Sequence, residues 1–304
     1  MTVTPDPDSF PAPSQTPGGR PVAVVTDTTT YAPEALLDGL GVQRVSLYVG
    51  WEDDLRRESD YEDLDRFYER LRESEVLPTT SQPSIGDFTA VYEPLLAAGN
   101  DIYSIHIASG LSGTLESARE AARALSKRDD LPGVIAAVDG QTGAGGLGCL
   151  VIAAAEAARA GAGLDEVGGA VADARSELDI WFCLDTLEFL RRGGRIGAAR
   201  ALLGSALRIK PILTFGTEIT PVSRVRTRSR ALERMEAYLA ELQGRGATDW
   251  VIQHAQSRED AEHLVSRGTE ILGKPPLFCT QVGPVLGAHL GSGLLVGGMR
   301  RTRD

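Results

Sequence analysis

Cysteine is scarce in this chain of 304 residues, and its scarcity excludes two kinds of architecture. The three cysteines, Cys149, Cys183 and Cys279, lie far apart and form no C-x-x-C pair. This pattern excludes a disulfide framework and a cysteine-based zinc site, and it favours a reducing compartment. The four histidines are scattered without H-E-x-x-H or paired-ligand spacing, so we expect no metal site.

Long apolar runs and positive charge are scarce as well. No apolar run approaches the roughly 18 residues of a membrane span, so we expect no integral membrane association. Lysine occurs only three times and the net charge is −11, which argues against nucleic acid as a partner. Residues 1–21 are rich in Pro, Asp and Ser and lack the charged and apolar regions of a signal peptide. They predict a disordered tail and a cytoplasmic protein.

The body of the chain, by contrast, is rich in alternating strand and helix patterns. Apolar runs such as 22–27, 101–108 and 133–139 alternate with segments of helical spacing. This order is typical of a parallel sheet that is covered by helices on both faces. We therefore predict an α/β protein in which residues 22–165 form an N-terminal domain of three layers, α/β/α, with a parallel sheet.

In residues 166–304 strands and helices no longer alternate strictly, which predicts a C-terminal α+β domain with a mixed sheet. Two apolar runs, 209–215 and 217–226, flank a Gly-Thr turn and predict an antiparallel pair of strands. Helical patterns and further strands follow, and we expect the last strand at 276–282.

Four segments of the chain have patterns that predict particular local structures. Residues 42–50 predict a single strand, and residues 76–86 predict a loop by their composition. A helix is expected at 196–207. Pro94 lies inside a helical pattern at 86–99, and it is expected to kink or shorten that helix.

Two glycine motifs suggest nucleotide binding, but their contexts do not fit. GAGGLG at 143–148 matches G-x-G-x-x-G, yet the second strand with its acidic end is missing about 20 residues further on. We interpret these glycines as letting a helix begin close to a sheet, and any role in a site stays open. The frame G-x-x-x-x-G-K at 268–275 has Pro275 in place of the magnesium-binding Ser or Thr. The chain is therefore expected to lack nucleotide-hydrolysing machinery.

Three segments combine hydroxyls, glycines and turn residues at the ends of predicted elements, namely 78–84, 108–114 and 287–293. Hydroxyls and the backbone N–H groups at a helix start bind carboxylates and phosphates, and His289 adds a pH-dependent donor. For any one segment alone, turn chemistry and helix caps, with Ser112 as a cap, explain the pattern as well. Three such segments in one chain favour a shared anion site.

A fourth segment, 184–213, places Arg191, Arg192 and Arg195 around a Gly-Gly turn between two helical patterns. Two interpretations remain open. The arginines are either a solvated charge run at a turn or a fixed basic surface that binds an acidic partner or a phosphate.

These four segments, together and in this order, resemble the DegV family over roughly residues 22–298. The chain departs from the family at Thr28 and Ala108, where the family commonly has serine, and in the stretch GQTGAGGLG. The stretches that carry the resemblance are VTDTTTYAP, TTSQPSIGDF, SIHIASGLSGT, LDTLEFLRRGGRIGAARALLGSALRIKPIL, VRTRSRAL and GPVLGAHLGSG.

The resemblance implies a two-domain protein that binds one long-chain fatty acid and uses no cofactor of its own. Similar members are the fatty-acid-binding subunits of bacterial fatty acid kinase. They carry the acid to a separate ATP-binding kinase subunit, which phosphorylates its carboxylate to an acyl phosphate. The resemblance implies that the carboxylate is bound by Thr80 with Thr79 beside it, by Ser109 and Gly110, and by His289.

The resemblance also places Arg192 and Arg195 near the head group and the kinase subunit, and it makes residues 166–304 the lipid-binding domain. A tail of roughly sixteen to eighteen carbons would gain about 0.8 kcal/mol per buried CH₂, on the order of 10 kcal/mol in all. The tail therefore sets the affinity, and uncharged donors hold the carboxylate in an accessible position.

Two functions from different classes remain. The first is a carrier with no catalytic residue, which does no chemistry alone. The second is a stand-alone serine hydrolase or acyltransferase that uses Ser109 and His289. The absence of a G-x-S-x-G elbow and of a third group to orient the histidine disfavours the hydrolase.

His106, which alternates with apolar residues in a predicted strand, is interpreted as a core histidine rather than a base. Binding of another apolar acid stays open.

Overall fold

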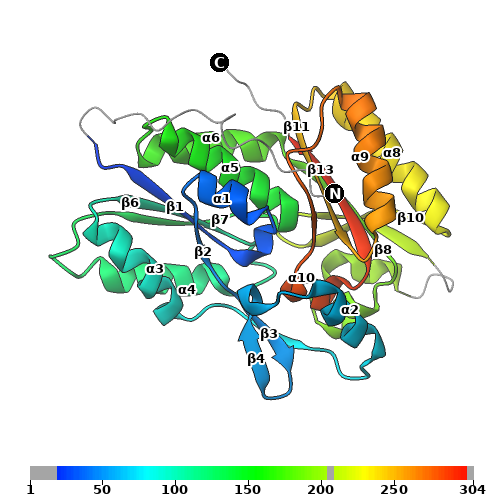
Figure 1. Ribbon diagram of the computed structural model, residues 1–304, viewed down its shortest axis with the longest axis horizontal. Helices are drawn as coiled ribbons and strands as arrows, with labels where there is room; N and C mark the ends of the chain where they lie inside the picture. The colour runs from blue at the N-terminus through cyan, green and yellow to red at the C-terminus, as the bar shows by residue number, and fades with distance from the viewer. Residues whose placement is uncertain (1–18, 204–208, 300–304) are drawn as a thin grey trace.

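The computed structural model describes residues 19–203 and 209–299, which form layers of helices and sheets (Figure 1). The predicted tail, residues 1–21, lies outside the described residues except for its last three. The predicted helix at 196–207 is observed as a 3₁₀ helix, Gly197–Leu202, and most of its remainder lies outside the described residues.

The first sheet is parallel throughout, with the strand order β2-β1-β6-β7. Its central strands, β1 and β6, are almost fully buried, as expected for a sheet that is covered on both faces. The predicted parallel sheet is therefore confirmed. Its strands are β1 (Val22–Asp27), β2 (Gln43–Val45), β6 (Asp101–His106) and β7 (Ile135–Asp139).

Helices cover both faces of this sheet and complete the three layers. α3 and α4 pack together on one face, whereas α5 and α6 pack on the other (Figure 1). α3 continues for three residues beyond Pro94, because the proline falls in the last turn and barely shortens the helix. The helices are α1 (Glu34–Gly39), α3 (Ile85–Ala97), α4 (Thr114–Leu125), α5 (Ala144–Arg159) and α6 (Leu164–Glu177).

The second sheet is mixed, with the order β10-β9-β8-β13-β11-β12, and among its described strands only β11 and β12 pair in parallel. The predicted antiparallel pair around the Gly-Thr turn is confirmed as β9 and β10. The sequence did not predict the central strand β13, whose glycines weaken the strand pattern. The strands are β8 (Asp179–Leu184), β9 (Lys210–Phe215), β10 (Ile219–Val225), β11 (Asp249–Ala255), β12 (Cys279–Gln281) and β13 (Gly293–Met299).

Helix α5 lies between the two large sheets, and its glycines allow this. A Cβ on Gly145 would lie 2.7 Å from Cγ2 of Val251, and one on Gly148 would lie 3.0 Å from the ring of Phe278. The GAGGLG glycines therefore let a helix begin close to a sheet, as predicted, although the sheet in contact is the second one. The other face of the second sheet is covered by α8 (Arg228–Gly244) and α9 (Arg258–Leu272).

A small antiparallel sheet with the order β4-β3-β5 corrects two predictions. Residues 42–50 do not form one strand, because they divide into β2 and β3, which belong to different sheets. The predicted loop at 76–86 contains β5, a strand too short to show a period in the sequence. The strands are β3 (Tyr48–Trp51), β4 (Asp54–Arg57) and β5 (Thr79–Ser81).

Helix α10 (Pro284–Leu290) joins the parts of the molecule, although the sequence did not predict it. It contacts α2 (Leu64–Glu73), α7 (Glu188–Arg192) and the small sheet. The proposed division at residues 165 and 166 falls at the start of α6, which packs on α5, and the two-domain description stays a prediction. None of the helices in the described part of the chain is long and apolar enough to cross a bilayer.

Candidate functional site

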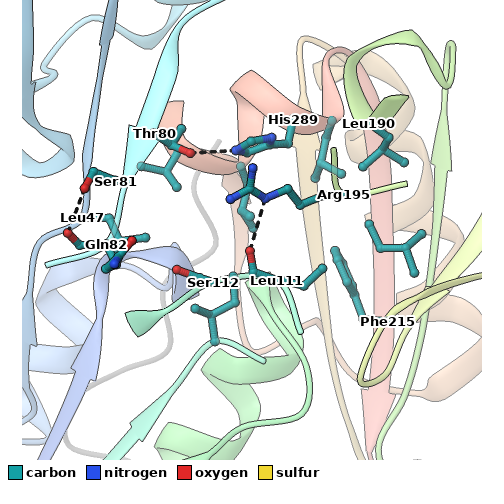
Figure 2. Close-up of a pocket in the computed structure, with 15 residues that line it drawn as sticks. Leu47, Thr80, Ser81, Gln82, Leu111, Ser112, Leu190, Arg195, Phe215 and His289 are labelled. Atoms are coloured by element: carbon teal, nitrogen blue, oxygen red, sulfur yellow. Dashed lines mark hydrogen bonds between the residues drawn. The ribbon is translucent and has the colours of Figure 1, made fainter. Parts of the chain in front are cut away.

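A pocket opens beside the carboxyl end of β6, where the small sheet, α10 and the second large sheet meet (Figure 2). Ligand sites of parallel sheets commonly lie at this end of the strands. Its open space, including the part open to solvent, is about 520 Å³. Polar residues Thr80, Ser81, Gln82, Ser112, Arg195 and His289 line it together with apolar residues Leu47, Ile107, Leu111, Leu190, Phe215, Ile219, Val285, Leu286 and Leu290.

Two of the predicted carboxylate ligands meet in this pocket. Oγ1 of Thr80 lies 2.8 Å from Nε2 of His289, and Figure 2 shows the two side chains pointing toward each other. Burial, and secondarily the Arg195 guanidinium, lowers the pKa of His289 to about 4. The imidazole is therefore neutral at pH 7, and Arg195 is the one cation among the polar residues that line the pocket.

The Gly-Gly turn of the arginine-rich segment supports the imidazole of His289. A Cβ on Gly193 would lie 2.3 Å from Nδ1 of His289, so only glycine leaves room for the ring. Nδ1 has no hydrogen-bond partner among the described residues. Arg195 follows the turn, and its guanidinium donates to the carbonyl oxygens of Gly193 at 2.8 Å and Leu111 at 3.4 Å. The turn thus positions both His289 and Arg195.

A buried carboxyl group fixes the start of α10. Oε1 of Glu58 accepts from the backbone N–H of Val285 at 2.8 Å and from the hydroxyl of Tyr31 at 2.7 Å, and Oε2 accepts from the hydroxyl of Thr28 at 2.5 Å. The Tyr31 oxygen accepts in turn from the N–H of Leu286. Burial raises the pKa of Glu58 to about 7, although these donors favour the ionised form. The helix that carries the histidine is therefore held by side chains from the other end of the chain.

Ser109 and Gly110 do not line this pocket. The hydroxyl of Ser109 donates to Oδ2 of Asp139 at 2.5 Å, and its backbone N–H donates to Oδ1 of the same residue. Gly110 packs against the turn between β9 and β10, because a Cβ there would lie 1.9 Å from the carbonyl oxygen of Thr217. The segment therefore holds the two halves of the molecule together at these residues.

Thr79 and Arg192 also point elsewhere. Thr79 is exposed and donates weakly to the carbonyl oxygen of Gly50 at 3.4 Å, because successive side chains of a strand alternate in direction. Arg192 is exposed and donates to the carbonyl oxygen of Glu75 at 2.7 Å. Of Arg192 and Arg195, which the resemblance places near the head group, only Arg195 lines the pocket.

The pocket also contains residues that were not predicted to contact a ligand. Ser112 supplies the hydroxyl that SGLSGT contributes, and its Oγ lies 2.9 Å from Oγ1 of Thr114. Leu286, His289 and Leu290 share one face of α10 at helical spacing. That spacing was the available signal, but two flanking glycines hid the helix in the sequence.

His106 is a core histidine, as predicted. Its Nδ1 lies 3.1 Å from Oδ2 of Asp27, its Nε2 lies 2.7 Å from Oγ of Ser104, and the hydroxyl of Tyr92 donates to that Oγ at 2.6 Å. The side chains of Asp27, Ser104 and His106 are completely buried. This arrangement has the order of a catalytic triad without access for a substrate.

The described residues contain no group of three or more His, Cys, Asp or Glu side chains that could hold a metal ion. Lys274, from the G-x-x-x-x-G-K frame, donates to Oδ1 of Asp249 at 2.7 Å. The frame itself spans the end of α9, which closes at Gly273 in a left-handed conformation. A helix end of this kind offers no phosphate loop, because such a loop precedes a helix.

The fold and the pocket define a class, an α/β protein of two large sheets with an apolar pocket under a hydroxyl, an imidazole and a guanidinium. The family model described as "Uncharacterised protein, DegV family COG1307" matches residues 21–297. The chain belongs to the DegV family.

Relatives and solved structures agree with this assignment. A DegV domain-containing protein of Streptomyces coelicolor is 37% identical over 279 residues, which cover 91% of this chain and 97% of that protein. A DegV-family protein from Thermus thermophilus, solved in a study of its fatty acid binding, is 30% identical with a TM-score of 0.82. Bacillus subtilis DegV, a fatty acid binding protein, gives the same identity and TM-score. Both alignments cover 93% of this chain and 100% of the other chain, and they confirm the predicted fold class.

Proposed function

We propose that this protein binds one long-chain fatty acid with its carboxylate beside Thr80, His289 and Arg195, and presents it to a separate ATP-binding kinase subunit. The observation that carries the proposal is the 2.8 Å contact between Thr80 and His289, which lie 209 residues apart in the chain. They meet beside an apolar pocket in a chain that resembles two fatty-acid-binding proteins over nearly its whole length.

The hydrogen bonds of the pocket suit a carboxylate. Nδ1 of His289 faces Gly193 without a partner, so its proton belongs on Nε2, which donates to Oγ1 of Thr80. The Thr80 hydroxyl is then free to donate to a ligand. Ser112, rather than Ser109, supplies a second hydroxyl in the pocket, and Arg195 supplies the positive charge. Such a site holds one carboxylate oxygen by neutral donors and leaves the other accessible.

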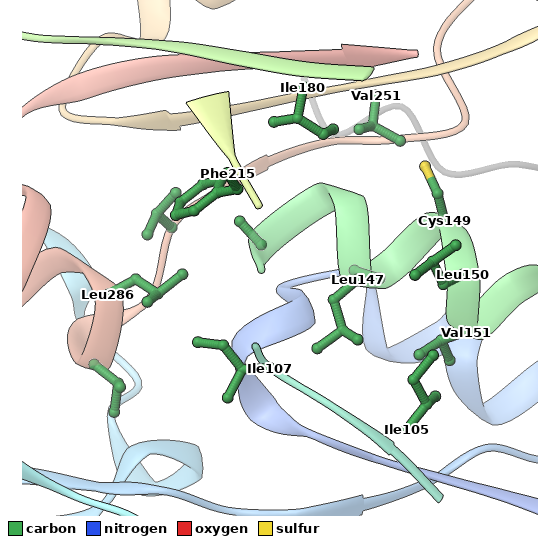
Figure 3. Close-up of a cluster of buried hydrophobic side chains, with 14 of the residues drawn as sticks. Ile105, Ile107, Leu147, Cys149, Leu150, Val151, Ile180, Phe215, Val251 and Leu286 are labelled. Atoms are coloured by element: carbon green, nitrogen blue, oxygen red, sulfur yellow. The ribbon is translucent and has the colours of Figure 1, made fainter. Parts of the chain in front are cut away.

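The tail would occupy the apolar side of the pocket. Leu286, Leu290 and Phe215 line it, and the buried apolar cluster of Figure 3 continues from Phe215 and Leu286 toward α5. Burial of roughly sixteen to eighteen carbons contributes on the order of 10 kcal/mol, far more than the polar contacts. Affinity therefore comes from the tail and orientation from the head group.

The kinase subunit would supply ATP and the chemistry. A carboxylate oxygen attacks the γ-phosphorus of ATP, the bond to the β-phosphate oxygen breaks, and an acyl phosphate and ADP form. Arg192 is exposed on the same turn as Arg195, and it suits an acidic surface of that subunit. The proposal places the protein in the cytoplasm, where the partner finds ATP.

No observation favours the stand-alone hydrolase. The hydroxyl of Ser109 is bonded to Asp139, and Nε2 of His289 is bonded to Thr80. The two side chains therefore do not form the pair of nucleophile and base that the alternative needs.

Native mass spectrometry of the purified protein tests the proposal. We expect one copurified molecule of fatty-acid mass per chain, its loss on delipidation, and its return when palmitic or oleic acid is added. Addition of ATP and the kinase subunit should then consume the acid, whereas the protein alone should leave acyl esters intact. A delipidated protein that takes up no fatty acid, or one that hydrolyses esters in a Ser109-dependent manner, contradicts the proposal.

A further inference from the structure

Phe215 separates two hollows of the molecule. It lines the pocket that contains His289, and it also lines a second hollow with about 500 Å³ of open space, part of it open to solvent. Figure 3 shows the ring between Leu286, which lines the first hollow, and Ile180, which lines the second. Phe215 is thus the wall between the two.

The ring is held firmly in this place. It stacks on Phe182 with ring centroids 4.4 Å apart and an interplanar angle of 18°. Phe182 lies in the central part of the second sheet and is 1% exposed, so its own position is fixed by packing. The turn that follows Phe215 is fixed as well, because Gly110 packs on the carbonyl oxygen of Thr217. A ring fixed in this position would limit the length of a tail that binds in the first hollow.

The two hollows differ in chemistry. On the side of His289, Phe215 is accompanied by Ile107, Leu286 and Leu290. On the far side, Arg175 and Asp179 line the second hollow. A methylene that passes the wall would leave apolar surroundings for polar ones and would gain little of the usual transfer free energy.

We propose that Phe215 is the residue that sets the length of the acyl tail, by closing the apolar end of the fatty acid site. The inference rests on the proposed function and specifies its substrate. The carboxylate is held at Thr80 and His289, and the terminal methyl group stops at the Phe215 ring. Each methylene that fits before the wall improves affinity about fourfold, and each one beyond it does not.

Competition among saturated acids from lauric to behenic, read by native mass spectrometry of the delipidated full chain, tests this. Phe215→Ala should open the space that the ring fills and shift the preference toward longer tails, by about fourfold for each added methylene that this space buries. Phe215→Trp should shift it toward shorter tails. Phe215→Leu gives a milder lengthening if the alanine variant folds poorly. Phe88→Leu, in the separate cluster between α3, α4 and the first sheet, should leave the preference unchanged.

The outcomes separate this inference from the proposed function. If the wild-type chain takes up none of the acids, the proposed function fails. If it binds them but the Phe215 variants lose affinity equally for every length, the ring is only part of the core and the inference is overturned. Opposite shifts in the alanine and tryptophan variants support it, because a loss of stability alone cannot produce two directions.

Discussion

Two histidines of this protein, His106 and His289, have similar partners and different surroundings. Each contacts a hydroxyl, at 2.7 Å for His106 and Ser104 and at 2.8 Å for His289 and Thr80. His106 is fully buried, and Asp27 occupies its second nitrogen. His289 lines a pocket, and its second nitrogen has no partner among the described residues.

The difference teaches how a histidine becomes available to a ligand. The contacts around His106 close on themselves, so its polar atoms are satisfied and contribute to stability alone. In the proposed site, the contact with His289 leaves the Thr80 hydroxyl free to donate to a ligand at an apolar cavity. Mutations in the closed cluster, formed by Asp27, Ser104 and His106, should therefore lower the free energy of unfolding. Mutations in the open pair, Thr80 and His289, should instead lower the affinity for a ligand.

Breaking the closed cluster should give the largest effect on the fold. Asp27→Ala leaves Nδ1 of His106 and the N–H groups of Thr29 and Ile107 without their acceptor. The free energy of unfolding should fall by about 3 kcal/mol or more, measured by urea denaturation. Asp129→Ala, an exposed aspartate, should change it by less than about 0.5 kcal/mol. A loss below about 1 kcal/mol for Asp27→Ala would show that the cluster is not a source of stability.

The carboxyl group of Glu58, which binds the start of α10, should make the free energy of unfolding depend on pH. Because the pKa of Glu58 is raised to about 7, the folded state binds a proton more tightly than the unfolded state, and this contribution is lost as the pH rises from about 4.5 to 7. The variant Glu58→Gln cannot ionise. Its stability relative to wild type should therefore increase with pH over that range, by up to about 1.4 kcal/mol per unit.

Urea titrations at several pH values measure this difference. Burial lowers the pKa values of His289 and His254 to about 4, so their contributions fall as the pH drops below about 6.5 in both proteins and cancel in the comparison. Glu69→Gln, on the exposed face of α2, serves as the control. A stability difference between Glu58→Gln and wild type that does not vary with pH would contradict the account.

Crowding the open pair should weaken binding without unfolding the protein. A Cβ in Gly193→Ala would lie 2.3 Å from Nδ1 of His289 and push the ring away from Thr80. Fatty acid affinity should fall by about tenfold, the value of one hydrogen bond to a charged group. Gly169→Ala, in the interior of α6 with open space around it, should leave affinity unchanged. Equal affinities in the two variants would show that the imidazole does not need its present position.

The smallest effects should separate the two arginines. Arg195→Glu should weaken fatty acid binding by at least roughly twofold, because the arginine lines the pocket. Arg192→Glu should leave binding unchanged and lower the rate of acyl phosphate formation with the kinase subunit. Isothermal titration and a coupled kinase assay measure the two quantities. If both variants lose lipid binding equally, the division between pocket and partner surface is incorrect.

The sequence predicted strands with a continuous apolar pattern better than elements whose pattern is interrupted by glycines. The run 22–27 begins with four consecutive apolar residues, and it became a strand with those bounds. β13 and α10 were missed because glycines, which allow close approach there, weaken both periodic patterns. A Cβ on Gly287 would lie 2.6 Å from the Tyr68 hydroxyl, and one on Gly297 would lie 2.0 Å from Ile180. These glycines are required by contacts that only the folded chain contains.

The site was predictable in part for a related reason. Thr80 and His289 stood out because hydroxyls and a histidine among glycines suggest an anion site, and the fold brings them together. Ser109 and Ser112 could not be told apart in the sequence, since both lie at the helix entry. Which of them faces the pocket depends on Asp139, the last residue of β7, which accepts the hydroxyl hydrogen of Ser109.

The most direct test of the central claim compares a fatty acid with the alcohol of the same chain length. The wild-type protein should bind palmitic acid more tightly than hexadecanol. His289→Ala and Thr80→Val should lose that preference by about tenfold while binding the alcohol as before. Thr79→Val, the neighbour on the exposed face of β5, should behave as wild type. An undiminished preference for the acid in both pocket variants would contradict the account, because the carboxylate would then be bound elsewhere.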